Sequence, residues 1–245
     1  MVKIHHVYAG DAALDEEATQ FFRTQWAAYR RLVDANYAHH REAYGTLNRL
    51  LLDEVDRPFW FLDLACGDAK ESVGALVGTQ IKHYHGVDLS PQALEMAAQN
   101  LEALDCEVDL EQADFVEAIR NRPDPADVVW FGLSLHHLET SDKREIMREI
   151  HEAMAAGGRF LIFEPAKNEG ESREAWHDRI EKIIRARWTA LSTDEHDMLV
   201  QHIRQCDMPE TVSGWRALGR EAGFREDRLL FRTPDELFAV ICFDK

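Results

Sequence analysis

Apolar residues recur at helical spacing in the first part of the chain and gather into short runs after it. Between residues 11 and 56, apolar positions three and four apart predict helices. From Phe59 on, five strand-like runs alternate with helical segments, and the first of them is apolar enough to be buried on both faces, as parallel strands are. The predicted strands are FWFLDL, KHYHGVDL, CEVDLEQAD, DVVWFGLSL and GRFLIFEP.

The helical segments carry signals for where they begin and end. Pro91 stands at the first position of PQALEMAAQNLEAL, and Gly157 and Gly158 are expected to close DKREIMREIHEAMAAGG. Residues 168–208 interrupt the alternation with two predicted helices, the second beginning with a capping arrangement in LSTDE. A further helix follows, and DRLLFRTPDELFAVICF then predicts two strands joined by a turn at TPDE.

This order of elements predicts an α/β fold. We expect a doubly wound, seven-stranded, mostly parallel sheet that ends in an antiparallel hairpin. Residues 1–57 are expected to form an N-terminal helical lid, and residues 58–245 to carry the sheet. The helical insertion at about 168–208 is expected to add to the lid, because it is appended to an otherwise complete sheet.

The charge of the chain limits its partners. Its 245 residues include 45 acidic and 28 basic ones, and the formal net charge of −17 repels nucleic-acid phosphates and anionic membranes. The densest basic cluster, Arg179–Arg187, is interleaved with apolar residues, which favours a solvated helix face. No apolar run approaches the roughly 18 residues of a membrane-spanning helix. We therefore expect no nucleic acid and no membrane as partner, and a homodimer stays open.

Cysteines and the N-terminal stretch indicate the compartment. The four cysteines are scattered without a CxxC pair, which favours reduced thiols over a disulfide framework or a zinc site. The stretch MVKIHHVYAGDAALDEE lacks the apolar core of a signal peptide. Both features predict a cytoplasmic protein. The neighbouring histidine pairs lack a third ligand at a recognisable spacing, so no metal is expected.

The stretch FLDLACGDAKESVGALV combines a strand, a turn of small residues and a helix. Such a turn brings backbone N–H groups and a helix N-terminus to one point, where a ligand can approach the main chain. Asp88 lies 21 residues after Gly67, at the spacing of an acid that binds ribose hydroxyls. In EQADF, Asp114 can accept from an adenine amino group and Phe115 can pack on the ring.

The acidic residues at the carboxyl edge of the predicted sheet favour one kind of cofactor. Asp63, Asp88 and Asp114 end three successive predicted strands, and the turn between the first strand and its helix reads A-C-G-D-A-K. A dinucleotide needs G-x-G-x-x-G to seat its pyrophosphate, and these acids would repel it. They suit a sulfonium nucleoside that carries an ammonium group. Charge therefore favours S-adenosylmethionine (SAM) over NAD.

At this point the sequence resembles the class I SAM-dependent methyltransferases over residues 59–165. DLACGDA stands at the family's glycine-rich turn, GVDLS at its ribose-binding acid and EQADF at its adenine-binding acid. DVVWFGLSLHHLE and MAAGGRFLIFEP resemble the segments around its fourth and fifth strands. The resemblance implies a Rossmann-like methyltransferase fold, SAM as cofactor and S-adenosylhomocysteine (SAH) as product. The turn departs from the family because Ala65 and Ala69 replace two glycines, which is tolerable if their backbone φ angles are negative.

The resemblance also implies roles for individual residues. The SAM ammonium group would meet Asp63 and the carbonyls near Ala65 and Leu133, and the ribose would meet Asp88. The full set of expected SAM contacts is Tyr44, Asp63, Ala65, Cys66, Gly67, Asp88, Leu89, Asp114, Phe115 and Leu133. Structural alternatives stay open: Asp63 as a turn-bonding acid, Asp114 as the N-cap of DFVEAI, and Tyr44 as an aromatic of the lid core. Cys66 is expected to be a small turn residue and not a nucleophile.

Three residues are candidates for catalysis. His136 and His137 follow the fourth predicted strand, on the edge where the methyl group would point, and one of them can deprotonate an acceptor. Glu164, which ends the fifth predicted strand, is a second candidate base. The alternative for the histidines is packing against the lid.

The lid segments narrow the function further. HREAYGTLNRLL and the insertion resemble the layout of carboxy-SAM synthase and related small-molecule methyltransferases. That synthase has an arginine in the inserted helix, whereas Val200 stands there in this chain, with Arg204 one turn away. We therefore predict a SAM-dependent methyltransferase that acts on an O, N or S atom of a small molecule. A carboxy-SAM synthase-like enzyme and a non-catalytic SAM- or SAH-binding protein remain alternatives.

Overall fold

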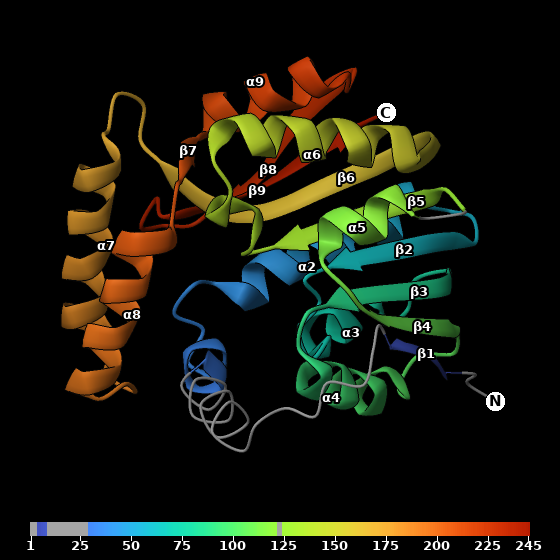
Figure 1. Cartoon of the computed structure of the whole chain (residues 1–245), viewed down its shortest axis with the longest axis horizontal. Helices are drawn as coiled ribbons and strands as arrows, with labels where there is room; N and C mark the ends of the chain where they lie inside the picture. The colour runs from blue at the N-terminus through green and yellow to red at the C-terminus, as the bar shows by residue number, and fades with distance from the viewer. Residues whose placement is uncertain (1–3, 9–28, 122–123) are drawn as a thin grey trace.

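The computed structural model of the protein describes residues 4–8, 29–121 and 124–245. A sheet runs through its middle in the strand order β1-β4-β3-β2-β5-β6-β9-β8, and the short β7 pairs with the end of β6 (Figure 1). The strands up to β6 run parallel, while β9 is antiparallel to both β6 and β8. The strands are β1 Ile4–Tyr8, β2 Phe59–Leu64, β3 Ile81–Asp88, β4 Glu107–Gln112, β5 Ala126–Gly132, β6 Met154–Lys167, β7 Glu210–Thr211, β8 Glu226–Arg232 and β9 Phe238–Asp244.

Helices cover both faces of this sheet. One buried layer includes α2, α3 and α4, and the other includes α5, α6 and α9. Successive side chains of a strand point to opposite faces, so Phe61 belongs to the first layer and Leu62 to the second. The helices are α2 His40–Glu54, α3 Lys70–Leu76, α4 Pro91–Leu101, α5 Phe115–Arg120, α6 Thr140–Ala153, α7 Arg173–Arg187, α8 Thr193–Cys206 and α9 Val212–Ala222.

The predicted fold class is confirmed, with two strands that the sequence did not reveal. β1 pairs in parallel with β4 inside the segment expected to be a helical lid, and β7 is only two residues long. Of the helices predicted between residues 11 and 56, residues 11–28 lie outside the described part. Residues 29–34 are helical and α2 follows them.

α2 shares the core of the sheet. Its buried face includes Ala43, Leu47 and Leu51, which belong to the same apolar cluster as Phe61 of β2 and Trp130 of β5. The helix therefore forms part of one layer of the fold. The division of the chain at residue 57 stays a prediction.

The end of α6 differs from the prediction. The helix ends at Ala153, and Met154 already pairs with Ala126 of β5. Gly157 has a φ of 72°, and a Cβ on Gly158 would lie 2.9 Å from the carbonyl oxygen of Asp127. The expectation that these glycines close the helix is wrong, because both lie within β6: Gly157 supplies a left-handed backbone, and Gly158 lets the strand pass close to β5.

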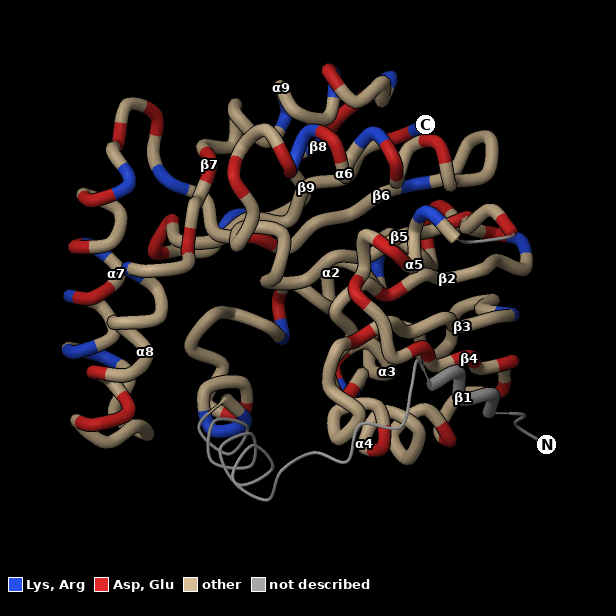
Figure 2. Tube along the Cα trace, in the orientation of Figure 1, with Lys and Arg blue, Asp and Glu red and all other residues tan. Residues whose placement is uncertain are grey.

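The insertion forms a helical hairpin, α7 and α8, that stands beyond the carboxyl ends of the parallel strands (Figure 1). The predicted cap of its second helix is confirmed, since Ser192 and Glu195 form a capping box. Acidic and basic residues are interspersed along α7, whereas α8 carries three acids near its start and one arginine near its end (Figure 2). In the basic cluster, Arg179 pairs with Glu171, and Arg185 pairs with Glu181 and Asp197. Within the described ranges, no helix has the length and apolarity needed to cross a bilayer.

Candidate functional site

The turn between β2 and α3 has a left-handed backbone at three positions. The φ angles are 55° at Ala65, 55° at Gly67 and 54° at Ala69. Glycine adopts this conformation freely, whereas an L-alanine is strained by about 1 kcal/mol. The condition that both alanines have negative φ is therefore not met. Leu133, which follows β5 at the same edge of the sheet, has a φ of 54° as well, and strained residues of this kind gather at functional sites.

This strain can be measured. Ala65→Gly is expected to raise the free energy of unfolding by about 1 kcal/mol, because glycine relieves the left-handed strain. Ala98→Gly, in the interior of α4, is the matched control and should lower it by about 1 kcal/mol. Urea unfolding followed by circular dichroism gives both values. Destabilisation by both substitutions would contradict the strain at Ala65.

Asp63 ends β2 as a fully enclosed acid. Its side chain is 2% exposed, and its Oδ2 accepts hydrogen bonds from the Ser72 hydroxyl at 2.6 Å and the Tyr84 hydroxyl at 2.7 Å. Burial raises the pKa of Asp63 to about 6, against the effect of these two hydrogen bonds. A positive group placed beside it would favour the ionised carboxylate.

Asp88 ends β3 and faces the turn. Its Oδ2 accepts from the backbone N–H of Gly67 at 2.9 Å, and its Oδ1 accepts from that of Ser90 at 2.8 Å. Burial raises the pKa of Asp88, and the hydrogen bonds from Ser90 and Gly67 oppose that rise. An ionised carboxylate has about four acceptor positions, and the backbone does not fill all of them.

Two of the residues expected around an adenine, Asp114 and Phe115, follow β4, at the same edge of the sheet. Asp114 is the N-cap of α5, with its Oδ1 accepting from the N–H of Val116 at 2.8 Å, so the structural alternative for this residue is present. Phe115 packs edge-on against Phe131, with ring centroids 4.9 Å apart. Leu89 is 65% exposed. The cap uses one oxygen of Asp114, and its adenine contact stays a prediction.

Tyr44 lies against β5, and Cys66 is part of the turn between β2 and α3. Tyr44 packs on Trp130 of β5, whose Nε1–H donates to the tyrosine hydroxyl at 3.3 Å. Burial and the neighbouring Asp63 raise the pKa of Cys66 well above its usual value. A thiol with a raised pKa is a poor nucleophile at neutral pH, which favours the interpretation of Cys66 as a turn residue.

A cavity of about 350 Å³ opens beyond this edge, under α7 and α8. The wall formed by α7 and α8 is largely apolar. On the side of the sheet, Pro165 of β6, Phe238 of β9 and Leu133, which follows β5, line the cavity. Lining residues from the lid include Ile180, Trp188, Leu191, Met198, Leu199 and Ile203. One end is polar, with His136, His137 and Asp207.

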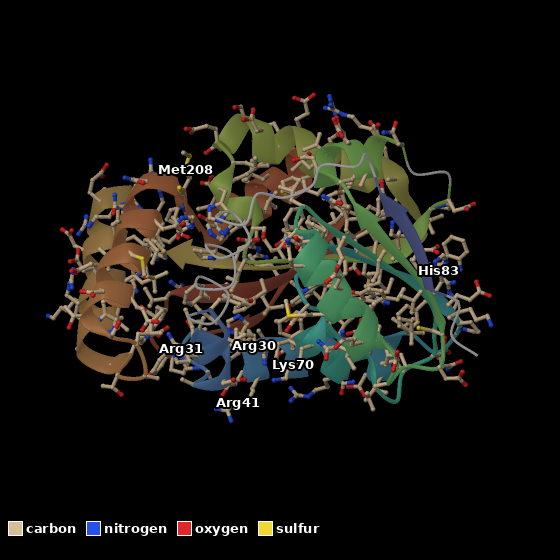
Figure 3. The ribbon with its side chains drawn as sticks, turned by 60° about the horizontal axis from the view of Figure 1, so that its bottom comes forward. Arg30, Arg31, Arg41, Lys70, His83 and Met208 are labelled. Carbon is tan, nitrogen blue, oxygen red and sulfur yellow. The ribbon has the colours of Figure 1, made fainter. Side chains whose placement is uncertain are left out.

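Residues 29–34 contact both the turn between β2 and α3 and the helix α8. Arg30 pairs with Asp68 of the turn at 3.0 Å, and Figure 3 shows it on the same side as Lys70. Its neighbour Arg31 pairs with Glu195 of α8. The segment therefore closes one side of the cavity.

Glu164 organises the polar end of the cavity. Its side chain is completely buried; Oε1 accepts from the N–H groups of Ser134 at 3.1 Å and Leu135 at 2.9 Å. Oε2 accepts from the N–H of His136 at 3.3 Å and lies 2.5 Å from its Nδ1. Because the carboxylate accepts, it fixes a proton on Nδ1 and turns Nε2 toward the cavity. Glu164 thus positions His136 and does not itself face the cavity as a base.

The two histidines respond differently to their surroundings. Burial opposes the charged form of His136, but the Glu164 carboxylate and Asp207 outweigh it, and the pKa of His136 is raised. For His137, burial and the charges of His136 and His202 lower the pKa to about 3. The predicted candidates His136, His137 and Glu164 are therefore brought together, with one ring held beside carboxylates and the other favoured in its neutral form.

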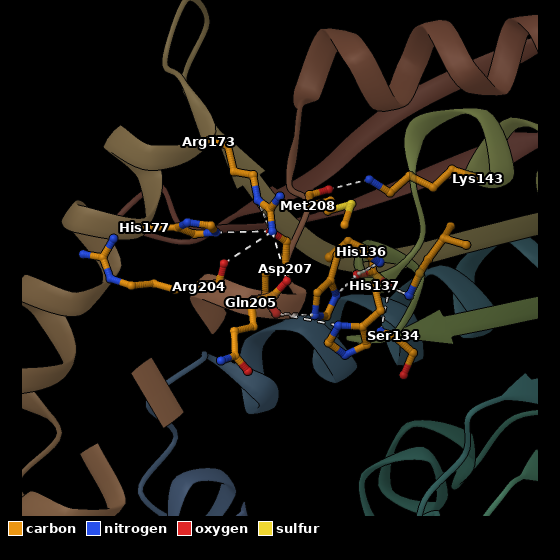
Figure 4. A network of polar contacts seen from close by, with 12 residues as sticks. Ser134, His136, His137, Lys143, Arg173, His177, Arg204, Gln205, Asp207 and Met208 are labelled. Atoms are coloured by element: carbon orange, nitrogen blue, oxygen red, sulfur yellow. Dashed lines mark hydrogen bonds and ion pairs between the residues drawn. The ribbon is translucent and has the colours of Figure 1, made fainter. Parts of the chain in front are cut away.

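Asp207 completes the group and was not predicted from the sequence. It follows α8, is 5% exposed, and its Oδ1 lies 3.5 Å from His136 Nε2 and 3.7 Å from His137 Nδ1 (Figure 4). Arg173 and His177 donate to its backbone carbonyl at 2.8 and 3.1 Å and hold the segment in place. No sequence spacing links position 207 to the histidines, because the path of the chain from α8 back to the sheet brings Asp207 next to them.

The strained turn, Asp88 and both histidines lie within the part of the chain that matches a known family, whereas most residues that line the cavity lie outside it. Residues 61–158 match a family model described as a methyltransferase domain. Over these residues the chain is similar to a methyltransferase domain. This part contains β2 to α6, and with them the turn, Asp88 and both histidines. No curated protein matches the chain by sequence.

Solved structures extend the similarity of the methyltransferase domain to nearly the whole chain. The plantazolicin methyltransferase BpumL, solved with SAH, is 13% identical, with 94% of this chain and 91% of that one covered and a TM-score of 0.64. The mitomycin 7-O-methyltransferase MmcR is 17% identical, with 94% and 58% covered and a TM-score of 0.60. An O-methyltransferase family 2 protein from Planctomyces limnophilus, solved with apigenin, is 16% identical, with 95% and 62% covered and a TM-score of 0.59.

These similarities establish the class I methyltransferase fold. Several of the matched proteins are longer than this chain, which spans 56% of a Nostoc punctiforme protein and 54% of the pyocyanin biosynthetic protein PhzM. The resemblance to carboxy-SAM synthase stays untested. Arg204, the one arginine near the position that the synthase uses, pairs with Asp178 and Glu181 of α7 at 2.6 Å.

Proposed function

We propose that the chain is a SAM-dependent methyltransferase that methylates an oxygen, nitrogen or sulfur atom of a small molecule and releases SAH. One observation carries this proposal: the cofactor edge of the methyltransferase domain opens into a largely apolar cavity with a polar end. Leu133, which follows β5 at that edge, also lines the cavity. A donor and an acceptor can therefore meet there.

The edge offers a partner for each part of SAM. The carboxylate of Asp88 is an acceptor that suits the ribose hydroxyls. The buried Asp63 suits the ammonium group, which would favour its ionised form. Leu89, Asp114 and Phe115 would surround the adenine, and Tyr44 would border the site from α2. The turn with Ala65, Cys66 and Gly67 would bring its backbone against the methionine part.

Methyl transfer depends mainly on the alignment of the donor and the acceptor. The positively charged sulfonium becomes a neutral thioether as the methyl group leaves, so the donor needs no activation and the acceptor must be held in line with it. With donor and acceptor bound, α7 and α8 would shield the reacting atoms from water. The polar end formed by His136, His137 and Asp207 would orient the acceptor's nucleophilic atom and take part in removing its proton.

The two alternatives are less well supported. Among the described residues that line the cavity there is no arginine, which speaks against binding the extra carboxylate of carboxy-SAM. A protein that binds SAM without catalysis has no need of an acceptor cavity beside the methyl position. The small size of that cavity favours a metabolite over a nucleic acid, and a cytoplasmic location stays a prediction.

The test is a transfer experiment with methyl-labelled SAM and fractionated small-molecule extracts. We expect the label to appear in an apolar compound with a hydroxyl, amine or thiol group. Calorimetry should show one SAM bound per chain and no binding of NAD. SAM binding without transfer to any compound would support the non-catalytic alternative, and absence of SAM binding would overturn the proposal.

A further inference from the structure

We propose that His136, His137 and Asp207 form a binding site for one divalent transition-metal cation, with zinc as the best match to the donor set. The sequence predicts no metal, because the paired histidines have no third ligand near them in the chain. The fold supplies that ligand from position 207. Cation binding itself does not depend on the proposed function.

The spacing of the donor atoms fits a small cation. Zinc binds imidazole nitrogen and carboxylate oxygen at about 2.0–2.1 Å in tetrahedral geometry, which separates two ligand atoms by about 3.3 Å. Asp207 Oδ1 lies 3.5 Å from His136 Nε2 and 3.7 Å from His137 Nδ1. The three donor atoms all lie within 4.8 Å of one another. His137 is partly exposed, so a small rotation of its ring closes the set.

The surrounding groups orient these donors as they do in metal sites. A metal-bound histidine usually donates its other N–H to a carboxylate or a backbone carbonyl. His136 does this through Nδ1 with the buried Glu164, which leaves Nε2 for the cation. Glu164 is itself held by three backbone N–H groups.

Asp207 supplies an independent indication of a missing ligand. Its buried Oδ1 accepts no hydrogen bond from the part of the chain that the structure describes. A buried carboxylate oxygen in that state is costly. When His136 is neutral, with its proton on Nδ1, two lone pairs face each other across 3.5 Å. A cation between them would satisfy both. The nearby Lys143 is already engaged by Glu210 and the Met208 carbonyl (Figure 4).

Three protein ligands leave a fourth tetrahedral position open, as in catalytic zinc sites. All three ligands line the cavity, so this position faces the space proposed for the acceptor. The consequence for substrate class rests on the proposed function: an acceptor with a hydroxyl or thiol group would bind the cation through its nucleophilic atom.

The test uses the purified full chain after treatment with a chelator. Calorimetric titration with zinc(II) is expected to show one cation per chain, and cobalt(II) should give the visible absorption of a low-coordinate site. Asp207→Asn and His137→Gln should each weaken zinc binding at least about tenfold. Asp197→Asn, the same chemical change at an exposed acid of α8, is the control and should bind as the wild type does.

Two outcomes would overturn the site. One is a wild-type protein that binds no zinc, and the other is zinc binding that survives both ligand substitutions unchanged. Circular dichroism of each variant shows whether it is folded. If Asp207→Asn does not fold, His137→Gln still tests the site, because the His137 side chain is 37% exposed and its substitution disturbs the core less. A SAM titration of the same samples reports on the proposed function separately, since neither ligand substitution touches the cofactor edge.

Discussion

Asp88→Ala is expected to weaken SAM binding about 100-fold. The carboxylate would accept two hydrogen bonds from the ribose, and a hydrogen bond to a charged group contributes about 1.5–3 kcal/mol. Loss of two such bonds removes about 3 kcal/mol, which corresponds to about two powers of ten in affinity. Isothermal titration of SAM and SAH into wild type and variant measures the change directly.

The same substitution also frees the N–H of Gly67 and loosens the turn, so two controls separate recognition from structure. Asp127→Ala removes an acid that holds a backbone N–H, that of Trp60 at 2.9 Å, at the opposite edge of the sheet. It should lower stability and leave SAM affinity unchanged. A SAH analogue without ribose hydroxyls should bind the wild type weakly and lose nothing further in Asp88→Ala. A variant that still prefers the complete ribose would show that Asp88 does not bind it.

The sheet could be predicted from the sequence because its buried strands are short apolar runs. FWFLDL coincides with β2 residue for residue, and the closing hairpin was visible from the turn between two apolar strands. β1 escaped prediction because an edge strand needs little apolar content, and its pairing with β4 spans about a hundred residues of chain. The end of α6 was misplaced because glycines that end a helix and glycines that admit a close strand look the same in one dimension.

The candidate site also has a part that could be predicted from the sequence and a part that could not. Residues near the carboxyl ends of predicted strands, such as Asp63, Asp88 and Glu164, could be placed at one edge from the order of elements alone. The roles of Glu164 and Asp207 could not. Glu164 looked like a base in sequence, but its enclosure by backbone N–H groups makes it a positioning residue. Asp207 depends on how the lid returns to the sheet, which no local pattern specifies.

Glu164→Gln is expected to lower the rate of methyl transfer about 100-fold while SAM affinity stays within about threefold. Glutamine has the same shape, and its carbonyl oxygen can still accept from Ser134 and Leu135. Its NH₂ group must then face His136, where the carboxylate now accepts at 2.5 Å from Nδ1. Because this NH₂ group donates, Nδ1 must accept and the imidazole proton must move to Nε2. Nε2 then has no lone pair to present to the cavity. Loss of a group that orients a functional histidine costs about 10–100-fold.

This prediction separates positioning from structure because the isosteric variant should keep its fold. Glu164→Ala leaves three backbone N–H groups without an acceptor and is expected to lower stability as well as activity. Glu149→Gln, at an acid of α6 that pairs with Arg120, is the matched control and should transfer methyl groups at the wild-type rate. Steady-state rates at saturating SAM, together with urea unfolding, distinguish these cases. An active Glu164→Gln enzyme would mean that the orientation of His136 has no part in the reaction, whereas an inactive and unfolded one would assign Glu164 to the core.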